Sequence, residues 1–550
     1  MTLNDIWTTS NTRPAPSRRT NGAGAIGGND QGRSDRRADL STLAQGGMLS
    51  LAGSIAGSIL AFLLVVVITR GLHSQGAGLL FEAIALFTIL SNVGELGADT
   101  GLVRMVSWNR ALDQTVKLRK MITVALWPVL IVGALFGAAV YVFAPQLAHV
   151  FMHGPHPEDG VIYIRLLAPF LPLAAATTVA LAGTRGFGTM VPYVAVLNIG
   201  VPGLRPILVL MAVAGGLGST AIALAYAAPV GLGFIVSIAV LLTLLRREER
   251  RKPRKATSRP SRVSSRVSAR ALASEFWRFS APRGLAGTMM IALVWLNILL
   301  IGALRSTRDA GVYAAASRYV GLGAFALAGL AMAIAPQISS LLAKNEQHRA
   351  SSVYHAATAW LMVPSWPAYV IVAMYAPLFM RVFGRDFASG QTALIILTLG
   401  SLSVIATGNN KVVLLMGGGS ALNLVSAGLA LALNIGLNLL LIPRYGINGA
   451  AIAYASSLLL DNIVTTTAVW LKLRLHPFGS GYPIVLVAAS TLYGGLGLAF
   501  RAYLGATVKS LALFAVAATT LYVGVLWIFR RRLNLRVLGT ALRSRGQRAL

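Results

Sequence analysis

The sequence predicts an all-α polytopic membrane protein, and three observations support this class. Of the 550 residues, 55% are hydrophobic and 12% are charged, whereas about a quarter of the residues in a soluble domain are charged. The apolar residues form continuous runs of about 20, the length at which a helix crosses about 30 Å of hydrocarbon. Because the runs do not alternate with polar residues, a β-barrel is excluded. The chain has no cysteine, so disulfides and thiolate metal sites are excluded as well.

We predict fourteen transmembrane helices, each an apolar run bounded by polar, glycine-rich or proline-rich segments. The predicted ranges are 46–69, 78–101, 121–143, 161–184, 190–214, 218–245, 279–303, 311–339, 354–380, 390–417, 419–442, 448–472, 481–501 and 507–529.

The basic residues orient these helices. Residues 102–120 contain five Lys and Arg, whereas residues 144–160 contain none. The longest inter-helix segment, 246–270, has eleven basic and two acidic residues, and the C-terminal tail begins with three arginines at 530–532. Lys and Arg accumulate in cytoplasmic loops, so we expect both termini to be cytoplasmic and the protein to lie in the plasma membrane. The net charge of +31 is explained by this topology and by anionic lipid headgroups, and we predict no binding of nucleic acid.

An internal repeat divides the chain. The segment 216–225 is similar to 446–455, and the segment 77–79 is similar to 310–312, with nearly equal offsets of 230 and 233 residues. Because each unit has an even number of helices, we expect two six-helix lobes related by a pseudo-two-fold axis along the membrane normal. The predicted parts are a disordered basic cytoplasmic tail (1–45), an N-lobe (46–245), a basic cytoplasmic linker (246–276), a C-lobe (277–473), two further helices (474–529) and a basic cytoplasmic tail (530–550).

Several motifs resemble those of bacterial polysaccharide flippases. They are Thr69-Arg-Gly-Leu72, the stretch GELGADTGLVR at 94–104, Phe279-Ser-Ala-Pro-Arg-Gly284 and the stretch GVYAAASR at 311–318. The similarity covers residues 45–475 and, more loosely, the last two helices. It implies membership of the exporter superfamily that holds polysaccharide flippases, the lipid II flippase and multidrug antiporters. The motifs are more specific for the superfamily than for the substrate.

Basic residues inside the predicted helices are the first candidate site. An intramembrane charge is costly, so it requires a partner or a hydrated cavity. Arg205 lies near mid-depth of the 190–214 helix, between two prolines. Arg283, Arg318 and Lys411 lie inside three helices of the second half. We predict that these four residues bind an anionic headgroup, because a guanidinium fork matches phosphate. The alternatives are structural ion pairs and side chains that reach the membrane surface.

Acidic residues within the helices are the second candidate site. Asp461, in the middle of the 448–472 helix, is a candidate counter-ion or proton acceptor. Glu95 and Asp99 are four residues apart and therefore share a helix face, with Arg104 just beyond them. We interpret these four residues as a coupling or gate group. For Glu95 and Asp99, helix capping or a simple ion pair is the alternative.

The leading hypothesis is a flippase that moves polyprenyl-pyrophosphate-linked oligosaccharide across the plasma membrane by alternating access. Two alternatives are a cation-coupled multidrug antiporter and a non-transporting scaffold of a polysaccharide synthase. The helix at 46–69 contains no carboxylate, which argues against the antiporter. We expect no catalytic residues, cofactor or metal. The expected partners are the lipid-linked saccharide, membrane lipids and enzymes of polysaccharide synthesis, and we expect a monomer.

Overall fold

The computed structural model describes residues 28–111, 115–154, 157–251, 269–530 and 532–533. Residues 1–48 and 49–550 form two compact units, and each is described by itself. In the first unit, residues 28–48 are helical and belong to the start of α1 (Gly28–Glu95). Helix therefore occupies residues 28–45, for which the sequence predicts a disordered tail.

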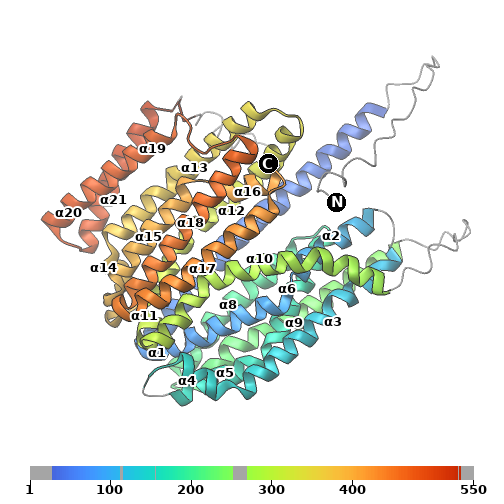
Figure 1. Cartoon of the computed structure of the whole chain (residues 1–550), viewed down its shortest axis with the longest axis horizontal. Coiled ribbons are helices and arrows are strands. Elements are labelled where there is room, and N and C mark those ends of the chain that lie inside the picture. Colours follow the sequence, from blue (N-terminus) through green and yellow to red (C-terminus); the bar gives the residue numbers. More distant parts are fainter. Residues whose placement is uncertain (1–27, 112–114, 155–156, 252–268, 531, 534–550) are drawn as a thin grey trace, which may run out of the picture. The chain divides into compact units, whose positions relative to one another are not determined.

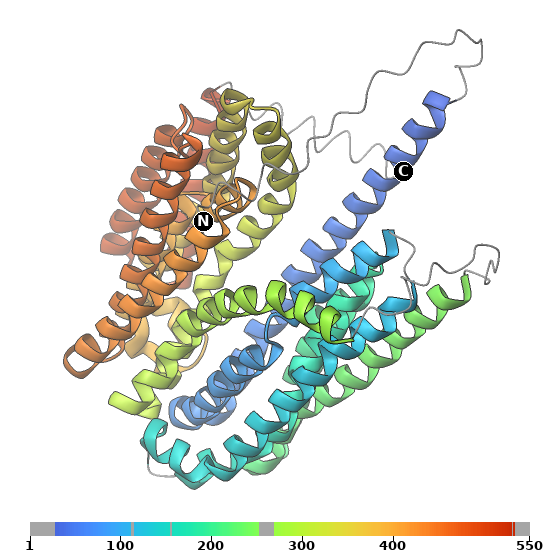
Figure 2. The same ribbon diagram turned by 45° about the vertical axis from the view of Figure 1, so that its right-hand side comes forward.

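The second unit consists of helices, and its described residues contain no strand (Figures 1 and 2). After α1 its elements are α2 (Ala98–Ala111), α3 (Thr115–Val142), α4 (Ala144–Phe151), α5 (Pro157–Leu167), η1 (Ala168–Phe170), α6 (Leu171–Gly186), α7 (Val191–Tyr193), η2 (Val194–Gly200), α8 (Val201–Ala214), α9 (Ser219–Arg251), α10 (Ala269–Leu304), α11 (Thr307–Ser317), η3 (Arg318–Gly321), α12 (Leu322–Ala343), α13 (Gln347–Met374), α14 (Ala376–Arg381), η4 (Arg385–Gly390), α15 (Gln391–Ala406), α16 (Asn410–Met416), α17 (Ser420–Tyr445), α18 (Ile447–Leu473), α19 (Tyr482–Ala489), η5 (Ser490–Gly495), α20 (Leu496–Leu504) and α21 (Val508–Ile528).

Within the described residues, twelve helical segments are long and apolar enough to cross a membrane. The first, Leu49–Arg110, has 62 residues. At 1.5 Å per residue it would be about 93 Å long, enough for two crossings, and non-helical dihedral angles at His73 divide it. The elements α11, η3 and α12 cover the predicted 311–339 helix. The predicted all-α fold is therefore confirmed, and each of the fourteen predicted ranges overlaps helix, with breaks inside some of them, as at residues 96–97 and 407–409.

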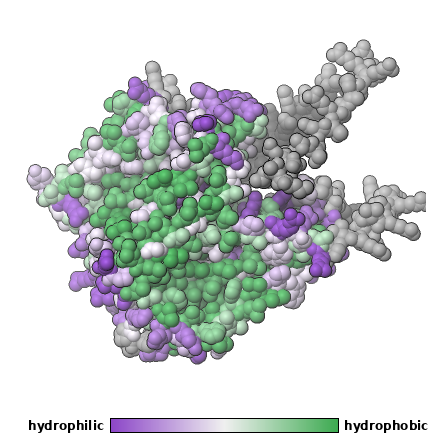
Figure 3. Space-filling model, viewed as in Figure 1, coloured by the Kyte–Doolittle hydropathy of each residue, from purple (hydrophilic) through white to green (hydrophobic). Residues whose placement is uncertain are grey.

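The surface fits a hydrocarbon environment. On α3, the side chains of Trp127, Ile131 and Leu135 recur every four residues, and each is more than half exposed. Figure 3 shows apolar residues over the middle of the visible face and hydrophilic residues towards the ends of the helices. In water such a surface would be strongly unfavourable, whereas lipid solvates it. The chain is a multi-pass membrane protein.

Helix contacts follow the predicted lobes. Helices α2, α3, α5, α6, α8 and α9 pack against one another, as do α12, α13, α15, α17 and α18. Helix α10 contacts both sets, because it packs against α17 and also against α2, α3 and α4. The helices of residues 482–528 are joined to the second set through a core that includes Tyr375 and Phe514.

The two repeat-related glycines meet each other. A Cβ atom on Gly311 would lie 3.0 Å from the Cα of Gly78 and 2.4 Å from the carbonyl oxygen of Ser74. A Cβ atom on Gly78 would clash with the carbonyl oxygen of Thr307. Equivalent residues contact each other only near a two-fold axis, so this contact, called here the α1–α11 contact, agrees with the predicted symmetry. It also requires glycine, because backbone approaches backbone.

Candidate functional site: two arginine clusters

Arg205 is held by the helix that follows it. It lies on α8, where the π-helical η2 and two prolines disturb the regular hydrogen bonding. Its Nε donates a hydrogen bond of 3.1 Å to the carbonyl oxygen of Tyr226 on α9, and its Cζ lies 4.0 Å from the centre of the Tyr226 ring. Among the described residues, no carboxylate forms an ion pair with Arg205.

Arg318, in the second half of the chain, is also held by an aromatic ring and a backbone carbonyl. It begins η3, directly after α11, and its Nε donates to the carbonyl oxygen of Ala314 at 3.3 Å. Its Cζ lies 4.7 Å from the centre of the Trp295 ring on α10, and its charge also interacts with Tyr226. No ion pair with a described carboxylate involves Arg318. Tyr226 therefore contacts Arg205 and lies within electrostatic range of Arg318, which comes from the other predicted lobe. We call Arg205, Tyr226, Arg318 and Trp295 the Tyr226 cluster.

Arg283 belongs to a second cluster, with Arg104. The Cζ of Arg104 on α2 lies 4.1 Å from the centre of the Phe279 ring, and the Cζ of Arg283 lies 4.0 Å from it. Both arginines are exposed. Arg283 precedes Trp295 by twelve residues, which corresponds to about 18 Å along a helix. The three predicted arginines therefore lie at two depths along the helices. Arg205 and Arg318 belong to the Tyr226 cluster, and Arg283 belongs to a second cluster with Arg104 and Phe279, called here the Phe279 cluster.

Glu95 and Asp99 lie inside the first set of helices. Both interact electrostatically with Tyr193, and Thr178 on α6 hydrogen-bonds to Glu95. Arg185 also reaches this group, with its Cζ 5.0 Å from the centre of the Tyr193 ring. Sequence reasoning missed Arg185, although its position at the end of an apolar run was a usable signal. Glu95, Asp99 and Arg185 therefore form a charged group around Tyr193 within one lobe.

Lys411 forms an ion pair with Asp461. Its Nζ lies 2.5 Å from Oδ2 of Asp461, whose side chain is 2% exposed while that of Lys411 is 30% exposed. Ser426 donates to the other carboxylate oxygen at 2.5 Å, and the Nζ of Lys411 also contacts Met290 on α10 at 3.5 Å. In this conformation the charge of Lys411 is compensated locally, unlike the charges in the two arginine clusters.

Sequence reasoning also assigned no role to Glu82, which is fully buried beside the α1–α11 contact. The hydroxyl of Thr307 donates to one of its carboxylate oxygens at 3.2 Å, and the other oxygen has no hydrogen-bond partner among the described residues. Nearby, His153 is within 3.0 Å of the carbonyl oxygen of Gly302, and a Cβ atom on Gly302 would clash with the Glu82 carboxylate. The long separation of Glu82 and Thr307 along the chain hid this arrangement.

A further polar group consists of three buried amides, for which the sequence favours hydrogen bonding between helices over contact with sugar hydroxyls. Asn297 on α10 accepts hydrogen bonds from Asn434 at 3.2 Å and from Asn438 at 2.9 Å, both on α17. The group joins the two helices, as polar residues commonly do in membrane proteins.

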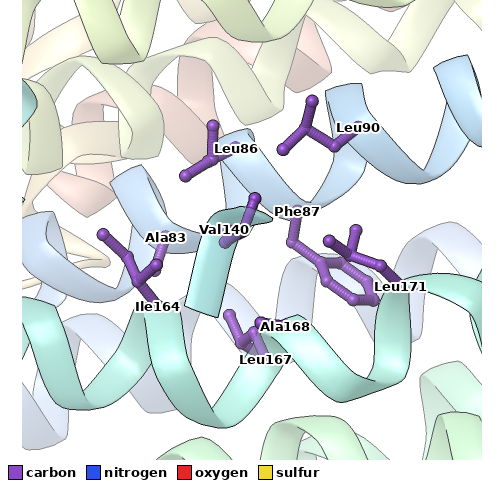
Figure 4. Close-up of a pocket in the computed structure, with 9 residues that line it drawn as sticks. All are labelled: Ala83, Leu86, Phe87, Leu90, Val140, Ile164, Leu167, Ala168 and Leu171. Atoms are coloured by element: carbon purple, nitrogen blue, oxygen red, sulfur yellow. The ribbon is translucent and has the colours of Figure 1, made fainter. Parts of the chain in front are cut away.

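The two cavities described here are lined by residues outside the Tyr226 cluster. The pocket in Figure 4 lies between α1, α3, α5, η1 and α6, and its lining side chains, such as Phe87 and Leu171, are hydrocarbon. Its volume of about 10 Å³ suffices for one water at most. A larger cavity of about 600 Å³ lies between the ends of α12 and α13, beside Lys344 and Arg349. In the described part of the chain, no group of His, Asp and Glu residues is arranged to hold a metal ion.

Comparisons with known proteins agree with this architecture. The sequence profile of the family described as polysaccharide biosynthesis protein matches residues 43–342, more than half of the chain. The probable low-salt glycan biosynthesis flippase Agl15 of Haloferax volcanii is 29% identical over 209 residues, which are 36% of this chain and 43% of Agl15. The matched region therefore spans less than half the length of that relative.

Solved structures show the same fold at low sequence identity. The lipid II flippase MurJ in an inward closed conformation has a TM-score of 0.66 at 11% identity, over 88% of this chain and 99% of MurJ. An inward-facing multidrug resistance transporter of the MATE family, in the MOP superfamily, has a TM-score of 0.62 at 13% identity, over 78% and 98%. The helices, their two-lobe arrangement and the sequence match together show that this chain is a membrane protein of the polysaccharide biosynthesis protein family.

Proposed function

We propose that the protein is a flippase that moves a polyprenyl-pyrophosphate-linked oligosaccharide across the plasma membrane. The observation that carries this proposal is the Tyr226 cluster, in which Arg205 and Arg318 come from different lobes and form no ion pair with a described carboxylate. Uncompensated cations within a membrane protein favour an anionic ligand. The family membership and the similarity to Agl15 support a glycan-linked lipid as that ligand.

The geometry of the cluster suits a phosphate group. A guanidinium stacked on a ring gains cation–π stabilisation through its face, while the N–H groups on its edge stay available for phosphate oxygens. Because the two arginines belong to different lobes, a bound diphosphate would be held while the lobes move relative to each other. The prenyl chain would stay in lipid, and the sugar would follow the headgroup between the lobes.

Alternating access needs contacts that break in turn. The α1–α11 contact, with Glu82 and Thr307, is one such contact between the lobes. The packing of α2 against α10 near Gly97 and Gly284 is the other. From the basic loops we place the α2–α10 contact on the cytoplasmic side, together with both termini. The same proposal keeps the domain boundaries given above and includes Lys411 as a further contact of the headgroup. It assigns coupling or gating to Asp461, Glu95, Asp99 and Arg104.

A reconstituted flipping assay tests this function. Purified protein in liposomes receives a fluorescent prenyl-diphosphate saccharide, and the fraction accessible from the opposite leaflet is measured over time. Replacing Arg205 with Ala removes charge-assisted hydrogen bonds worth about 1.5–3 kcal/mol, so we expect flipping to slow about 10- to 100-fold. Arg165, an exposed arginine 5.6 Å from the Tyr141 ring, supplies the matched control Arg165→Ala, which keeps the parental rate.

Three outcomes would contradict the proposal. If R205A and R318A both flip the lipid at the parental rate, the cluster is not the headgroup site. If the parent does not flip the lipid but exports organic cations against a proton or sodium gradient, the protein is an antiporter. If the parent does neither, a scaffold role in polysaccharide synthesis is favoured.

A further inference from the structure

The α2–α10 contact is made by backbone atoms. At the break between α1 and α2, Gly97 has a φ of +73°, and a Cβ atom there would clash with the carbonyl oxygen of Ser280. A Cβ atom on Gly284 would lie 2.5 Å from the amide nitrogen of Gly97. Because only glycine permits this approach, the two helices have no room to slide and must separate if the contact opens.

Helix α10 is divided at this contact. Its first part is buried among helices of the first lobe, where Leu272 and Phe276 share a core with residues of α2, α3, α6 and α9. Its later part packs in the larger core and against α17. Pro282 lies between the two parts and removes a backbone hydrogen bond. Figure 2 shows the α10 ribbon changing direction along its length. The bend is therefore the natural hinge for opening the contact.

Two cations and one ring bridge the contact. Arg104 belongs to α2, whereas Phe279 and Arg283 belong to α10, and both guanidinium carbons lie about 4 Å from the ring centre. Both guanidinium groups therefore contact the same ring, which links α2 to α10. Among the described residues neither forms an ion pair or a hydrogen bond. Each guanidinium thus has a modest aromatic contact and unused N–H donors.

We propose that Arg104, Phe279 and Arg283 form a latch that a diphosphate headgroup releases. A phosphate group offers charge-assisted, bidentate hydrogen bonds, which are stronger than the contact of an exposed arginine with a ring. A diphosphate that arrives at the cytoplasmic mouth draws the guanidinium groups from Phe279, and α10 then bends at Pro282. This inference rests on the proposed function, because the ligand that opens the α2–α10 contact is the substrate of the proposed flippase.

Spin labels measure the latch directly. The chain has no cysteine, so labels attach only at introduced positions. Trp108 on α2 and Val294 on the part of α10 beyond Pro282 are exposed, and the full chain with Trp108→Cys and Val294→Cys is placed in nanodiscs of zwitterionic lipid. We expect both inorganic pyrophosphate and farnesyl diphosphate to increase the population with the longer inter-label distance. With Arg104→Gln or Arg283→Gln, the required concentration rises about tenfold, because one phosphate-binding fork is lost.

The ring itself is tested separately. Phe279→Leu removes the shared ring, so the longer distance is populated without ligand. The control Phe187→Leu removes the ring beside Arg110, 5.6 Å away within the first lobe, and leaves the distance unchanged. If F279L does not fold, the R104Q titration decides, since Arg104 is exposed.

Three results would overturn the latch: no response of the parent to either diphosphate, no effect of the Arg104 and Arg283 substitutions, or the same opening in nanodiscs of anionic phospholipid without diphosphate. The last would indicate a general response to lipid headgroups. Loss of flipping in R205A together with any of these results rejects the latch and leaves the proposed function intact.

Discussion

The α1–α11 contact gives the sharpest prediction about the equilibrium between conformations in which this contact is closed and conformations in which it is open. In Gly311→Ala, the new Cβ atom would lie 2.4 Å from the carbonyl oxygen of Ser74, whereas ordinary contacts begin at 3.4 Å. The two backbones must therefore separate by about 1 Å. Because overpacking costs about 1–3 kcal/mol, conformations in which this contact is open gain about 5- to 150-fold in relative population.

The assay again uses paired labels in the cysteine-free chain. Phe143, at the end of α3, and Tyr445, at the end of α17, are each more than half exposed and belong to different lobes. With F143C and Y445C labelled, G311A is expected to move the distance distribution toward longer values. A Cβ atom added at Gly436 on α17 would meet no other atom within 4 Å, so Gly436→Ala is the matched control and keeps the parental distribution.

An unchanged distribution in a stable, folded G311A protein would refute this reasoning. It would mean that the backbone relaxes locally and that the contact does not govern the separation of the lobes. A shift of the same size in G436A would refute it too, since that substitution adds a methyl group to open space.

Three further predictions concern buried polar groups. Asp461→Asn leaves Lys411 without its carboxylate, so we expect the thermal unfolding midpoint, measured by tryptophan fluorescence, to fall. Adding Lys411→Met should restore part of that stability, because it removes the unpaired charge. An unchanged midpoint in D461N would contradict this. Asn297→Ala removes the acceptor of two buried amides and should lower the free energy of unfolding by about 1–3 kcal/mol, seen as a lower melting temperature. An unchanged melting temperature would mean that the amides find other partners. Glu82→Gln keeps an acceptor for the Thr307 hydroxyl and removes a carboxyl group with no cationic partner among the described residues. We therefore expect an equal or higher melting temperature, and a markedly lower one would show that the charge is needed.

Much of the fold was predictable because the bilayer acts on each segment separately. A run of about 20 apolar residues must form a helix whatever its neighbours are, since unpaired backbone groups are costly in hydrocarbon. Boundaries were harder to predict. The 78–101 helix is interrupted at Leu96 and Gly97, where φ is positive, and helix begins at Gly28, before the predicted first span.

The candidate site was predictable only as a set of residues. An arginine in an apolar run can be recognised as unusual from the sequence, as Arg205 and Arg318 were. The rings that they contact, Tyr226 and Trp295, could not be recognised, because an aromatic residue in a membrane helix is ordinary. Arg104 was assigned to a gate and Arg283 to substrate binding, yet both contact the same ring.

The sequence by itself therefore determined the membrane environment, the helices and the two-fold repeat, since these depend on local hydrophobicity and on similarity along the chain. Only the tertiary structure decided which charges are compensated. Lys411 meets Asp461 fifty residues away along the chain, while Arg205 lies over the Tyr226 ring and Arg318 lies over the Trp295 ring. The physical reason is that an electrostatic interaction depends on distance and burial in space, and helix packing brings together residues that the sequence keeps far apart.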